Sequence, residues 1–404
     1  MEDISEAEKQ EFQHFINIIY SYMTYKRDGS VDVERIYRSF DLLSKDDKEL
    51  LKESPARRTF QILQALMLNQ QFISLMLSSI VDVDEGQNSR PIESNNYTES
   101  MEDILKRLRY IVKNSSFCRI PQEVEDPEIQ PTTDPVVLQR NMNWVRTTLR
   151  QFVRDWSEEG AQERNQCFEP LLDALKRRVP IVDKSKRPKV LCPGSGLGRL
   201  PFEVLNLGYA SQGNEFSYFM LIGSFFIINH SIKPKSLKIY PYCLDTSNRM
   251  TFKDQLQPVA IPDVSPADSN FEGHDFSMCA GEFTEVYENI HEEFDAVLTS
   301  FFLDTAKNVI TYVRTIAKIT KKGGLWANIG PLLYHYADIS HNSIELPWDE
   351  LESIISKWFK IENLCWKDAN YTSNPSSMMK TQYKCVYFEA IRSDVEVIGR
   401  SNIF

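Results

Sequence analysis

Apolar side chains recur at helical spacing in four stretches of the first half of the chain. The stretches are 6–25, 60–81, 101–113 and 142–159, and in each of them apolar positions lie three or four residues apart with polar positions between them. This period is that of an amphipathic α-helix whose apolar side packs on another surface. We therefore predict a helical region at the start of the chain.

Two stretches interrupt this pattern. Residues 84–100 are polar and include Gly86, Pro91 and two adjacent asparagines, so we expect a loop or a disordered insertion there. Residues 121–135 contain four prolines among acidic residues. Proline restricts its own backbone and that of the residue before it, which predicts an extended connection.

The pattern changes from Arg187 onward, where short apolar segments alternate with helical stretches. The apolar segments read PKVLCP, LKIYPY, FDAVLTSFF, GGLWANIG and KCVYFEA. Alternating strands and helices are typical of an α/β fold with a mainly parallel sheet and crossover helices. We predict an N-terminal helical region over residues 1–140 and an α/β domain, with the helix that precedes it, over residues 141–404.

The composition fits one catalytic domain with a helical extension. The chain has 404 residues, 42% of them hydrophobic and 25% charged, which is enough to bury a full core. Its formal net charge of -11 argues against nucleic acid as a partner, because binding to phosphates depends on clustered Lys and Arg.

Further features bear on the compartment of the protein. The longest apolar run, 216–229, is shorter than the roughly 20 residues that span a bilayer, and the charged N-terminus has no apolar signal core. The seven cysteines are odd in number and form no CxxC pair, so we expect reduced thiols rather than disulfides or a zinc cluster. These features predict a soluble intracellular protein with no membrane partner and no metal.

A glycine loop follows the first predicted strand of the α/β region. Segment 189–200 reads KVLCPGSGLGRL, so the strand runs directly into Gly194 and the glycines after it. Glycine lets the backbone approach a ligand closely, and the helix that follows offers free N–H groups. Glycines also serve ordinary turns between a strand and a helix, and the loop alone leaves that alternative open.

The residues downstream favour a nucleotide-like ligand. Glu215 stands at the end of the second predicted strand, where a carboxylate can accept hydrogen bonds from both hydroxyls of a ribose. Enzymes that use NAD share this arrangement. The loop, however, has the bulky Leu197 and then Arg199 where a pyrophosphate would have to pass, which favours S-adenosylmethionine over a dinucleotide.

Four more residues follow predicted strands. Glu282 and Phe283, in the segment MCAGEF, offer an acid and an aromatic ring that could hold an adenine. Asp304 lies just past a strand end, and His335 comes from the loop after the next strand. Open α/β sheets place their reacting groups at this edge.

Several short motifs of the sequence resemble motifs of the carnosine N-methyltransferase family. They are PGSGLGR (193–199), GYASQGNE (208–215), FFLDTAKN (301–308), GPLLYH (330–335) and SSMMKTQYKC (376–385). The resemblance spans roughly residues 142–388. It implies a Rossmann-like class I methyltransferase fold with a seven-stranded, mainly parallel sheet, and S-adenosylmethionine as the cofactor.

The resemblance also implies a set of cofactor contacts. The residues that would contact the methionine end, the ribose and the adenine of the cofactor are, in chain order, Gln151, Arg154, Gly194, Glu215, Glu282 and Phe283. Gln151 and Arg154 would close over the methionine end, and Glu215 would bind the ribose. The family usually has Asp at the position of Glu282, so the hydrogen bond to adenine has to be made by a side chain that is one methylene longer.

For the acceptor the resemblance implies four residues, Asp304, His335, Tyr371 and Tyr383. Asp304 and His335 would carry the reaction, in which a methyl group passes to the imidazole ring of carnosine to give anserine, or to other histidine-containing peptides. Asp304 would accept the N–H of one ring nitrogen and stabilise the cation that forms. A structural histidine and tyrosines that merely cover the sheet edge are the alternatives. The loop 371–380 would act as a lid.

The same residues are also compatible with two other classes of protein. A methyltransferase-like fold can serve as a non-catalytic binding or scaffold protein, although the glycine loop and Asp304 are intact. An NAD-dependent oxidoreductase would need a loop that admits a pyrophosphate. The helical region can support a homodimer as well as a lid over the site, and the resemblance places the protein in the cytoplasm and also in the nucleus.

Overall fold

The computed structural model consists of two units, and each unit contains segments that are far apart in the sequence. The first, here named the helical unit, comprises Met1–Glu158, Ile222–Ala267 and Pro375–Met379; the second, the sheet unit, comprises Glu159–Leu221, Asp268–Asn374 and Lys380–Phe404. The structure describes residues 6–81, 100–117, 129–183, 185–230, 232–268, 275–338 and 342–397. The predicted boundary between residues 140 and 141 stays a prediction, and α6 (Pro135–Trp156) runs through it.

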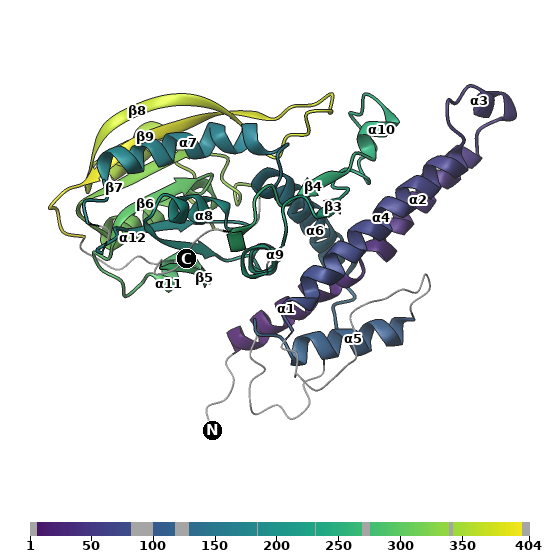
Figure 1. Cartoon of the computed structure of the whole chain (residues 1–404), viewed down its shortest axis with the longest axis horizontal. Helices are drawn as coiled ribbons and strands as arrows, with labels where there is room; N and C mark the ends of the chain where they lie inside the picture. Colours follow the sequence, from purple (N-terminus) through teal and green to yellow (C-terminus); the bar gives the residue numbers. More distant parts are fainter. Residues whose placement is uncertain are drawn as a thin grey trace. The chain divides into compact units, whose positions relative to one another are not determined.

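The helical unit is built mainly from long helices (Figure 1). Its elements are α1 (Glu6–Met23), α2 (Tyr25–Asp41), α3 (Lys45–Glu49), α4 (Pro55–Ser78), α5 (Met101–Lys113), α6, the end of α9 (Tyr218–Asn229), β3 (Leu237–Ile239), α10 (Phe252–Gln255) and β4 (Val259–Ile261). The predicted helices over 6–25, 60–81, 101–113 and 142–159 are confirmed as α1, α4, α5 and α6.

Side-chain caps explain where several of these helices begin. Ser54, Ser100 and Asp134 each accept a hydrogen bond from a backbone N–H in the first turn of the helix that follows. Such caps satisfy N–H groups that the helix itself leaves unpaired. Helix α2 was not predicted, because it contains Gly29 and many polar residues. A Cβ atom at Gly29 would lie 2.9 Å from Leu66 Cδ2, so the glycine permits α2 and α4 to pack closely.

Two interruptions predicted from the sequence fall largely outside the described residues. Residues 82–99 and 118–128 are not described. They include most of the polar interval 84–100 and about half of the proline-rich connection 121–135. Residues 129–134 have no regular secondary structure, and Pro135 begins α6. Proline suits the first turn of a helix because its missing N–H would have no partner there.

The sheet unit holds a seven-stranded sheet in the order β5-β2-β1-β6-β7-β9-β8. Its strands are β1 (Lys189–Pro193), β2 (Ala210–Glu215), β5 (Phe276–Ala280), β6 (Phe294–Ser300), β7 (Thr320–Gly330), β8 (Phe359–Asn370) and β9 (Gln382–Arg392). The first five in sheet order pair in parallel, whereas β9 is antiparallel to both β7 and β8. The predicted Rossmann-like methyltransferase fold with a mainly parallel sheet of seven strands is confirmed.

One predicted strand lies elsewhere. The segment LKIYPY was expected in the main sheet, but Leu237–Ile239 forms β3, which pairs antiparallel with β4 in a separate two-stranded sheet. The prediction was wrong because a short apolar segment does not reveal its partner. Pro234 and Pro241 flank this one and lack the N–H that a longer ladder needs. The strand beyond β2 in the main sheet is instead β5.

Helices cover both faces of the main sheet. They are α7 (Ala161–Arg178), α8 (Arg199–Asn206), α11 (Phe283–Val286), α12 (Val309–Ile319) and α13 (Trp348–Ile355). Val190 and Cys192 of β1 belong to the apolar cluster with α7 and α8, and Leu191 between them belongs to the cluster with α12 and α13. This alternation is the period of two that a strand buried on both faces requires.

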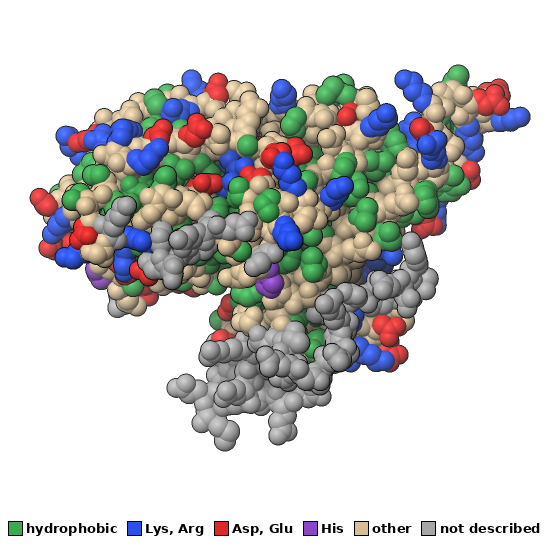
Figure 2. Space-filling model, viewed as in Figure 1, with side chains coloured by type: hydrophobic (Ala, Val, Ile, Leu, Met, Phe, Trp, Pro, Cys, Tyr) green, Lys and Arg blue, Asp and Glu red, His purple; other side chains and the backbone are tan. Residues whose placement is uncertain are grey.

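The sheet order places the carboxyl ends of β1, β2, β6 and β7 at one edge, because these strands run parallel. On the molecular face drawn in Figure 2, Lys and Arg side chains are interspersed with Asp and Glu side chains. None of the helices in the described ranges is both long and apolar enough to cross a membrane.

Candidate active site

The glycine loop after β1 adopts a backbone conformation that glycine alone adopts readily. Gly194, Gly196 and Gly198 have φ angles of 64°, 56° and 81°. A Cβ atom at Gly194 would lie 2.6 Å from Cδ2 of Phe302, which is far inside a normal contact. The loop therefore needs glycine for its backbone and for its close packing, as expected of a loop that cradles a ligand.

Glu215 ties this loop to the end of β2. One carboxylate oxygen accepts the N–H of Gly196 at 2.8 Å, and the other accepts the N–H groups of Phe216 and Ser217, each at 2.8 Å. The structure thus brings Gly194 and Glu215 to the same edge of the sheet. A carboxylate can accept about four hydrogen bonds, so Glu215 can hold the loop and a sugar hydroxyl together.

Glu282 and Phe283 lie beside β2, where the N–H of Gly281 donates to the carbonyl of Glu215 at 3.0 Å. Glu282 caps α11 through Oε2, which accepts the N–H of Thr284 at 2.6 Å. The ring of Phe283 is only 2% exposed. It packs against Phe302 and Tyr312 with centroid distances of 5.2 Å in both cases. The two predicted adenine contacts therefore stay predictions, and Phe283 also belongs to the core.

Asp304 lies on the 3₁₀ turn η2 (Leu303–Thr305) after β6 and is 2% exposed. Its Oδ2 accepts the N–H of Leu333 at 2.9 Å. Burial raises the pKa of the Asp304 carboxyl, and the hydrogen bond from Leu333 and the charge of His335 act in the opposite direction. A buried carboxylate with a raised pKa at a strand end is typical of a group that takes part in proton chemistry.

His335 is brought to Asp304 by the backbone. The N–H of His335 donates to the carbonyl oxygen of Asp304 at 2.9 Å, although the two residues are separated by strand β7 in sequence. Its side chain is exposed. The structure therefore places both predicted catalytic residues at the carboxyl ends of β6 and β7, where a ligand could reach the imidazole from solvent.

Phe301 connects the two predicted tyrosines to this edge. The Tyr371 ring stacks on the Phe301 ring with centroids 4.7 Å apart, and the Tyr383 ring meets it edge-on at 5.9 Å. Phe301 has a φ of 53°, which is strained for a residue with a side chain. The sequence did not single out Phe301, because a phenylalanine after an apolar strand has the character of a core residue.

Ser300, the last residue of β6, is a second residue that the sequence did not single out. Its Oγ is buried and has no hydrogen-bond partner among the described residues. A buried hydroxyl without a partner is costly unless a ligand or water completes it. Its place directly before Phe301 puts this donor at the candidate site.

Gln151 and Arg154 lie in the last turns of α6, in the helical unit, and both are buried. Both side chains bond to Asp155: Gln151 Nε2 donates to Oδ2 at 3.1 Å, and Arg154 Nη1 donates to Oδ1 at 3.1 Å. Asp155 thus orients the pair, and the sequence did not single it out. The assignment of Gln151 and Arg154 to the cofactor stays a prediction.

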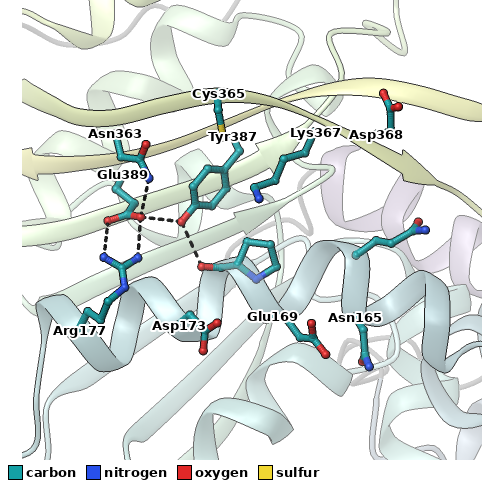
Figure 3. Close-up of a pocket in the computed structure, with 12 residues that line it drawn as sticks. Asn165, Glu169, Asp173, Arg177, Asn363, Cys365, Lys367, Asp368, Tyr387 and Glu389 are labelled. Carbon is teal, nitrogen blue, oxygen red and sulfur yellow. Dashed lines mark hydrogen bonds and ion pairs between the residues drawn. The ribbon is translucent and has the colours of Figure 1, made fainter.

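A groove of about 610 Å³ in the sheet unit lies between α7 and strands β8 and β9 (Figure 3). None of the ten predicted site residues lines it. Glu389 accepts hydrogen bonds there from Arg177 at 2.8 Å, Asn363 at 3.0 Å and Tyr387 at 2.8 Å. These bonds hold the helix to the sheet, which is a structural role. Among the described residues no cluster of His, Cys, Asp or Glu could hold a metal ion.

The comparisons of the sequence with a family model and with curated proteins agree on one family. A family model described as carnosine N-methyltransferase matches residues 131–394, which is more than half of the chain. A carnosine N-methyltransferase of Mus musculus is 34% identical over 390 residues, covering 95% of this chain and 87% of the relative. One of Dictyostelium discoideum is 34% identical over 396 residues, covering 96% and 77%. The crystal structure of magnesium protoporphyrin IX methyltransferase from Synechocystis with bound SAH aligns with a TM-score of 0.33 at 10% identity, covering 65% of this chain and 90% of that one.

Proposed function

Because this chain belongs to the carnosine N-methyltransferase family, we propose that it methylates an imidazole nitrogen of carnosine (β-alanyl-L-histidine) to give anserine. The chain is an S-adenosylmethionine-dependent methyltransferase that acts on a small substrate. The observation that best supports an imidazole acceptor is the position of the buried Asp304. It lies beside His335 and three residues after Phe301, and the rings of Tyr371 and Tyr383 pack against Phe301. Other histidine-containing peptides would be further acceptors.

The residues at the sheet edge fit S-adenosylmethionine. Gly194 has a left-handed backbone and leaves no room for a side chain, and the carboxylate of Glu215 lies next to the loop. In our proposal Glu215 accepts a ribose hydroxyl, and Glu282 and Phe283 contact the adenine. The family resemblance assigns the methionine end to Gln151 and Arg154. When bound, the cofactor supplies an electrophilic methyl group on a sulfonium.

Asp304 sets the reactivity of the acceptor ring. A neutral imidazole has one nitrogen with a lone pair and one N–H. If the N–H donates to Asp304, the lone pair of the other nitrogen is the one that faces the methyl group, and the ring gains electron density. The methylated ring is a cation that the carboxylate stabilises. A carboxyl whose pKa burial has raised is also better able to take up the proton that this ring must lose.

The remaining acceptor residues hold the ring in place. Tyr371 and Tyr383 flank Phe301 and would confine the imidazole between aromatic surfaces. His335 would contact the same substrate from the loop after β7. Correct positioning supplies much of the rate, because a nitrogen that is already a nucleophile needs chiefly to be aligned with the methyl carbon.

A methylation assay tests the proposal. The purified protein and its Asp304→Ala variant are each incubated with S-adenosylmethionine and either carnosine or one of a panel of histidine-containing peptides. The products are analysed by mass spectrometry. We expect a product heavier by one CH₂, located on the imidazole and absent with Asp304→Ala. Turnover of a peptide but not of carnosine would change the acceptor. No turnover of any acceptor, with the cofactor still bound, would favour a binding or scaffold protein.

The partners and the location of the protein belong to the same proposal. We propose a homodimer in the cytoplasm and also in the nucleus, with neither nucleic acid nor membrane as a partner, in keeping with the net charge of -11. Analytical ultracentrifugation of the purified chain tests the dimer. Imaging of the tagged protein in cells tests the location.

A further inference from the structure

The first turns of α7 hold the backbone that follows β8. Glu163, which is 6% exposed, accepts the N–H of Thr372 at 2.7 Å, and its other oxygen accepts the N–H and the hydroxyl of Ser373 at 2.9 and 3.0 Å. One turn further along α7, Gln166 Oε1 accepts the N–H of Asn370 at 3.0 Å. Two side chains of one helix thus bind the backbone on both sides of Tyr371.

This arrangement stabilises a conformation that the segment would not adopt alone. Thr372 has a φ of 48°, in the left-handed region, where a β-branched residue is a genuine outlier. Such a conformation is unfavourable and persists only where the surroundings enforce it. A buried carboxylate that accepts two adjacent N–H groups provides that enforcement, since charge-assisted hydrogen bonds are the strong ones.

We propose that Glu163 is a positioning residue for Tyr371 and thereby controls binding of the acceptor. The inference rests on the proposed function, in which Tyr371 contacts the acceptor ring. Glu163 fixes the backbone directly after Tyr371, and Gln166 fixes it directly before. With both ends held, the Tyr371 ring stays stacked on Phe301, which follows β6 at the edge where Asp304 lies.

Loss of the Glu163 carboxylate therefore has a selective effect. The segment after Tyr371 would leave its left-handed conformation, and the ring would lose its fixed place on Phe301. Acceptor binding should weaken, because the aromatic surface is no longer preorganised. Cofactor binding should not change, since the Glu215 carboxylate is held by the N–H groups of Gly196, Phe216 and Ser217.

The test compares Glu163→Gln with the unmodified protein. Glutamine keeps the shape but offers one acceptor oxygen instead of two. We expect the amides of Thr372 and Ser373 to exchange hydrogen about fivefold faster, and KM for carnosine to rise about tenfold with kcat and the Kd of S-adenosylmethionine within about twofold. Glu169→Gln is the matched control, because Glu169 is exposed on the same helix and lies in the groove of Figure 3. It should behave like the unmodified protein.

A double-mutant cycle with Tyr371→Ala shows whether Glu163 acts through Tyr371. We expect Glu163→Gln to raise KM in the presence of Tyr371 and to add nothing in the Tyr371→Ala background. Unchanged hydrogen exchange in Glu163→Gln, or an equal rise in KM in both backgrounds, would overturn the inference.

Failure of the proposed function would look different. An unmodified protein that turns over no imidazole acceptor would overturn the function, while hydrogen exchange would still show whether Glu163 fixes the segment. If carnosine is turned over but Tyr371→Ala has normal kinetics, Tyr371 is not an acceptor residue and the positioning role of Glu163 is overturned with it.

Discussion

The ring of Tyr371 stacks on the ring of Phe301, with the centroids 4.7 Å apart and an angle of 28° between the planes. The contact joins the end of β8 to the end of β6, strands that are not neighbours in the sheet. It carries an aromatic side chain from the antiparallel part of the sheet toward the edge where Asp304 lies. The acceptor side of the site therefore depends on a contact between residues far apart in the chain.

Replacing Phe301 by leucine should weaken acceptor binding selectively. Leucine keeps an apolar side chain but removes the ring on which Tyr371 and Tyr383 pack. Because an aromatic pair contributes about 0.5–1.5 kcal/mol, we expect KM for the acceptor to rise about 2-fold to 10-fold. Steady-state kinetics and calorimetric titration of the cofactor measure the two effects separately. Phe60→Leu, at a position 61% exposed, is the control. A change in cofactor affinity of the same size would contradict the prediction.

Asp304→Asn should abolish methyl transfer without unfolding the protein. The amide keeps an oxygen for the N–H of Leu333 but cannot stabilise a cationic ring, so we expect kcat to fall at least about 100-fold. Cofactor affinity should remain nearly unchanged. An equal loss of kcat and of cofactor affinity would show that Asp304 does not act on the acceptor.

The same substitution has a predicted pH dependence of stability. Burial raises the pKa of Asp304 in the folded state, so the ionised carboxyl costs stability above that pKa. The cost disappears as the pH falls toward the pKa of the unfolded state. Asp304→Asn should therefore be at least as stable as the unmodified protein at pH 7, and the advantage should shrink in acid. Urea unfolding at several pH values measures this, and a variant that is less stable at pH 7 would disprove it.

Glu215→Gln should weaken cofactor binding first. The substitution removes the charge of a carboxylate that accepts three backbone N–H groups and, in our proposal, a ribose hydroxyl. Hydrogen bonds to charged groups contribute about 1.5–3 kcal/mol, which predicts a rise of about 10-fold to 100-fold in the Kd of S-adenosylmethionine. The exposed Glu159, changed to glutamine, serves as the control. Unchanged cofactor affinity in Glu215→Gln would show that the ribose binds elsewhere.

Gly194→Ala and Gly323→Ala should differ in a way that isolates steric packing. Both glycines have left-handed backbones, with φ angles of 64° and 77°. A Cβ atom at Gly194 would meet Phe302 at 2.6 Å, whereas one at Gly323 would meet nothing within 4 Å. Gly323→Ala should cost about 1 kcal/mol of unfolding free energy. Gly194→Ala should cost more and should also reduce cofactor affinity. Equal losses of unfolding free energy in the two variants would show that the Phe302 side chain moves aside without cost.

Glu389→Gln should reduce stability at neutral pH but much less in acid. Burial alone would raise the pKa of Glu389, but hydrogen bonds from Arg177, Asn363, Tyr387 and Arg178 lower it to about 2. The stability that the charge contributes is therefore complete above the ordinary pKa of 4.5 and is lost as the pH falls toward 2.

The size of this effect is limited by solvent. Arg177 and Arg178 are 54% and 30% exposed, so screening reduces the contribution of the Glu389 charge to about 1 kcal/mol. Denaturant unfolding at pH 7, 4 and 3 should show that the difference in unfolding free energy between the unmodified protein and Glu389→Gln is largest at pH 7 and shrinks at pH 4 and again at pH 3. A difference that does not depend on pH would point to lost packing in place of lost charge.

Local sequence was sufficient to predict many of the elements. The periodicity of apolar residues predicted α1, α4, α5 and α6, and the strands β1, β6, β7 and β9. It also placed Glu215 and Asp304 at strand ends, because the carboxyl ends of parallel strands share one edge of a sheet. Short motifs that match those of the family predicted the family. These features are carried by residues that are neighbours along the chain.

The partners of short or irregular segments could not be predicted in the same way. LKIYPY has the apolar character of a strand, yet it pairs with β4 and not with the main sheet. The adenine contact of Phe283 stays a prediction, and the sequence did not indicate that its ring also packs against Phe302 and Tyr312. Periodicity states which side of an element is apolar but not which surface that side meets.

The sequence by itself determined the fold class, the family and the residue types available for chemistry. Only the tertiary structure decided that Tyr371 and Tyr383 meet on Phe301, and that Glu163 fixes the backbone beside Tyr371. The physical reason is that these residues are separated in sequence by a strand or more. Their contacts arise from the order of strands in the sheet and from the packing of α7 on it, which no local pattern of side chains records.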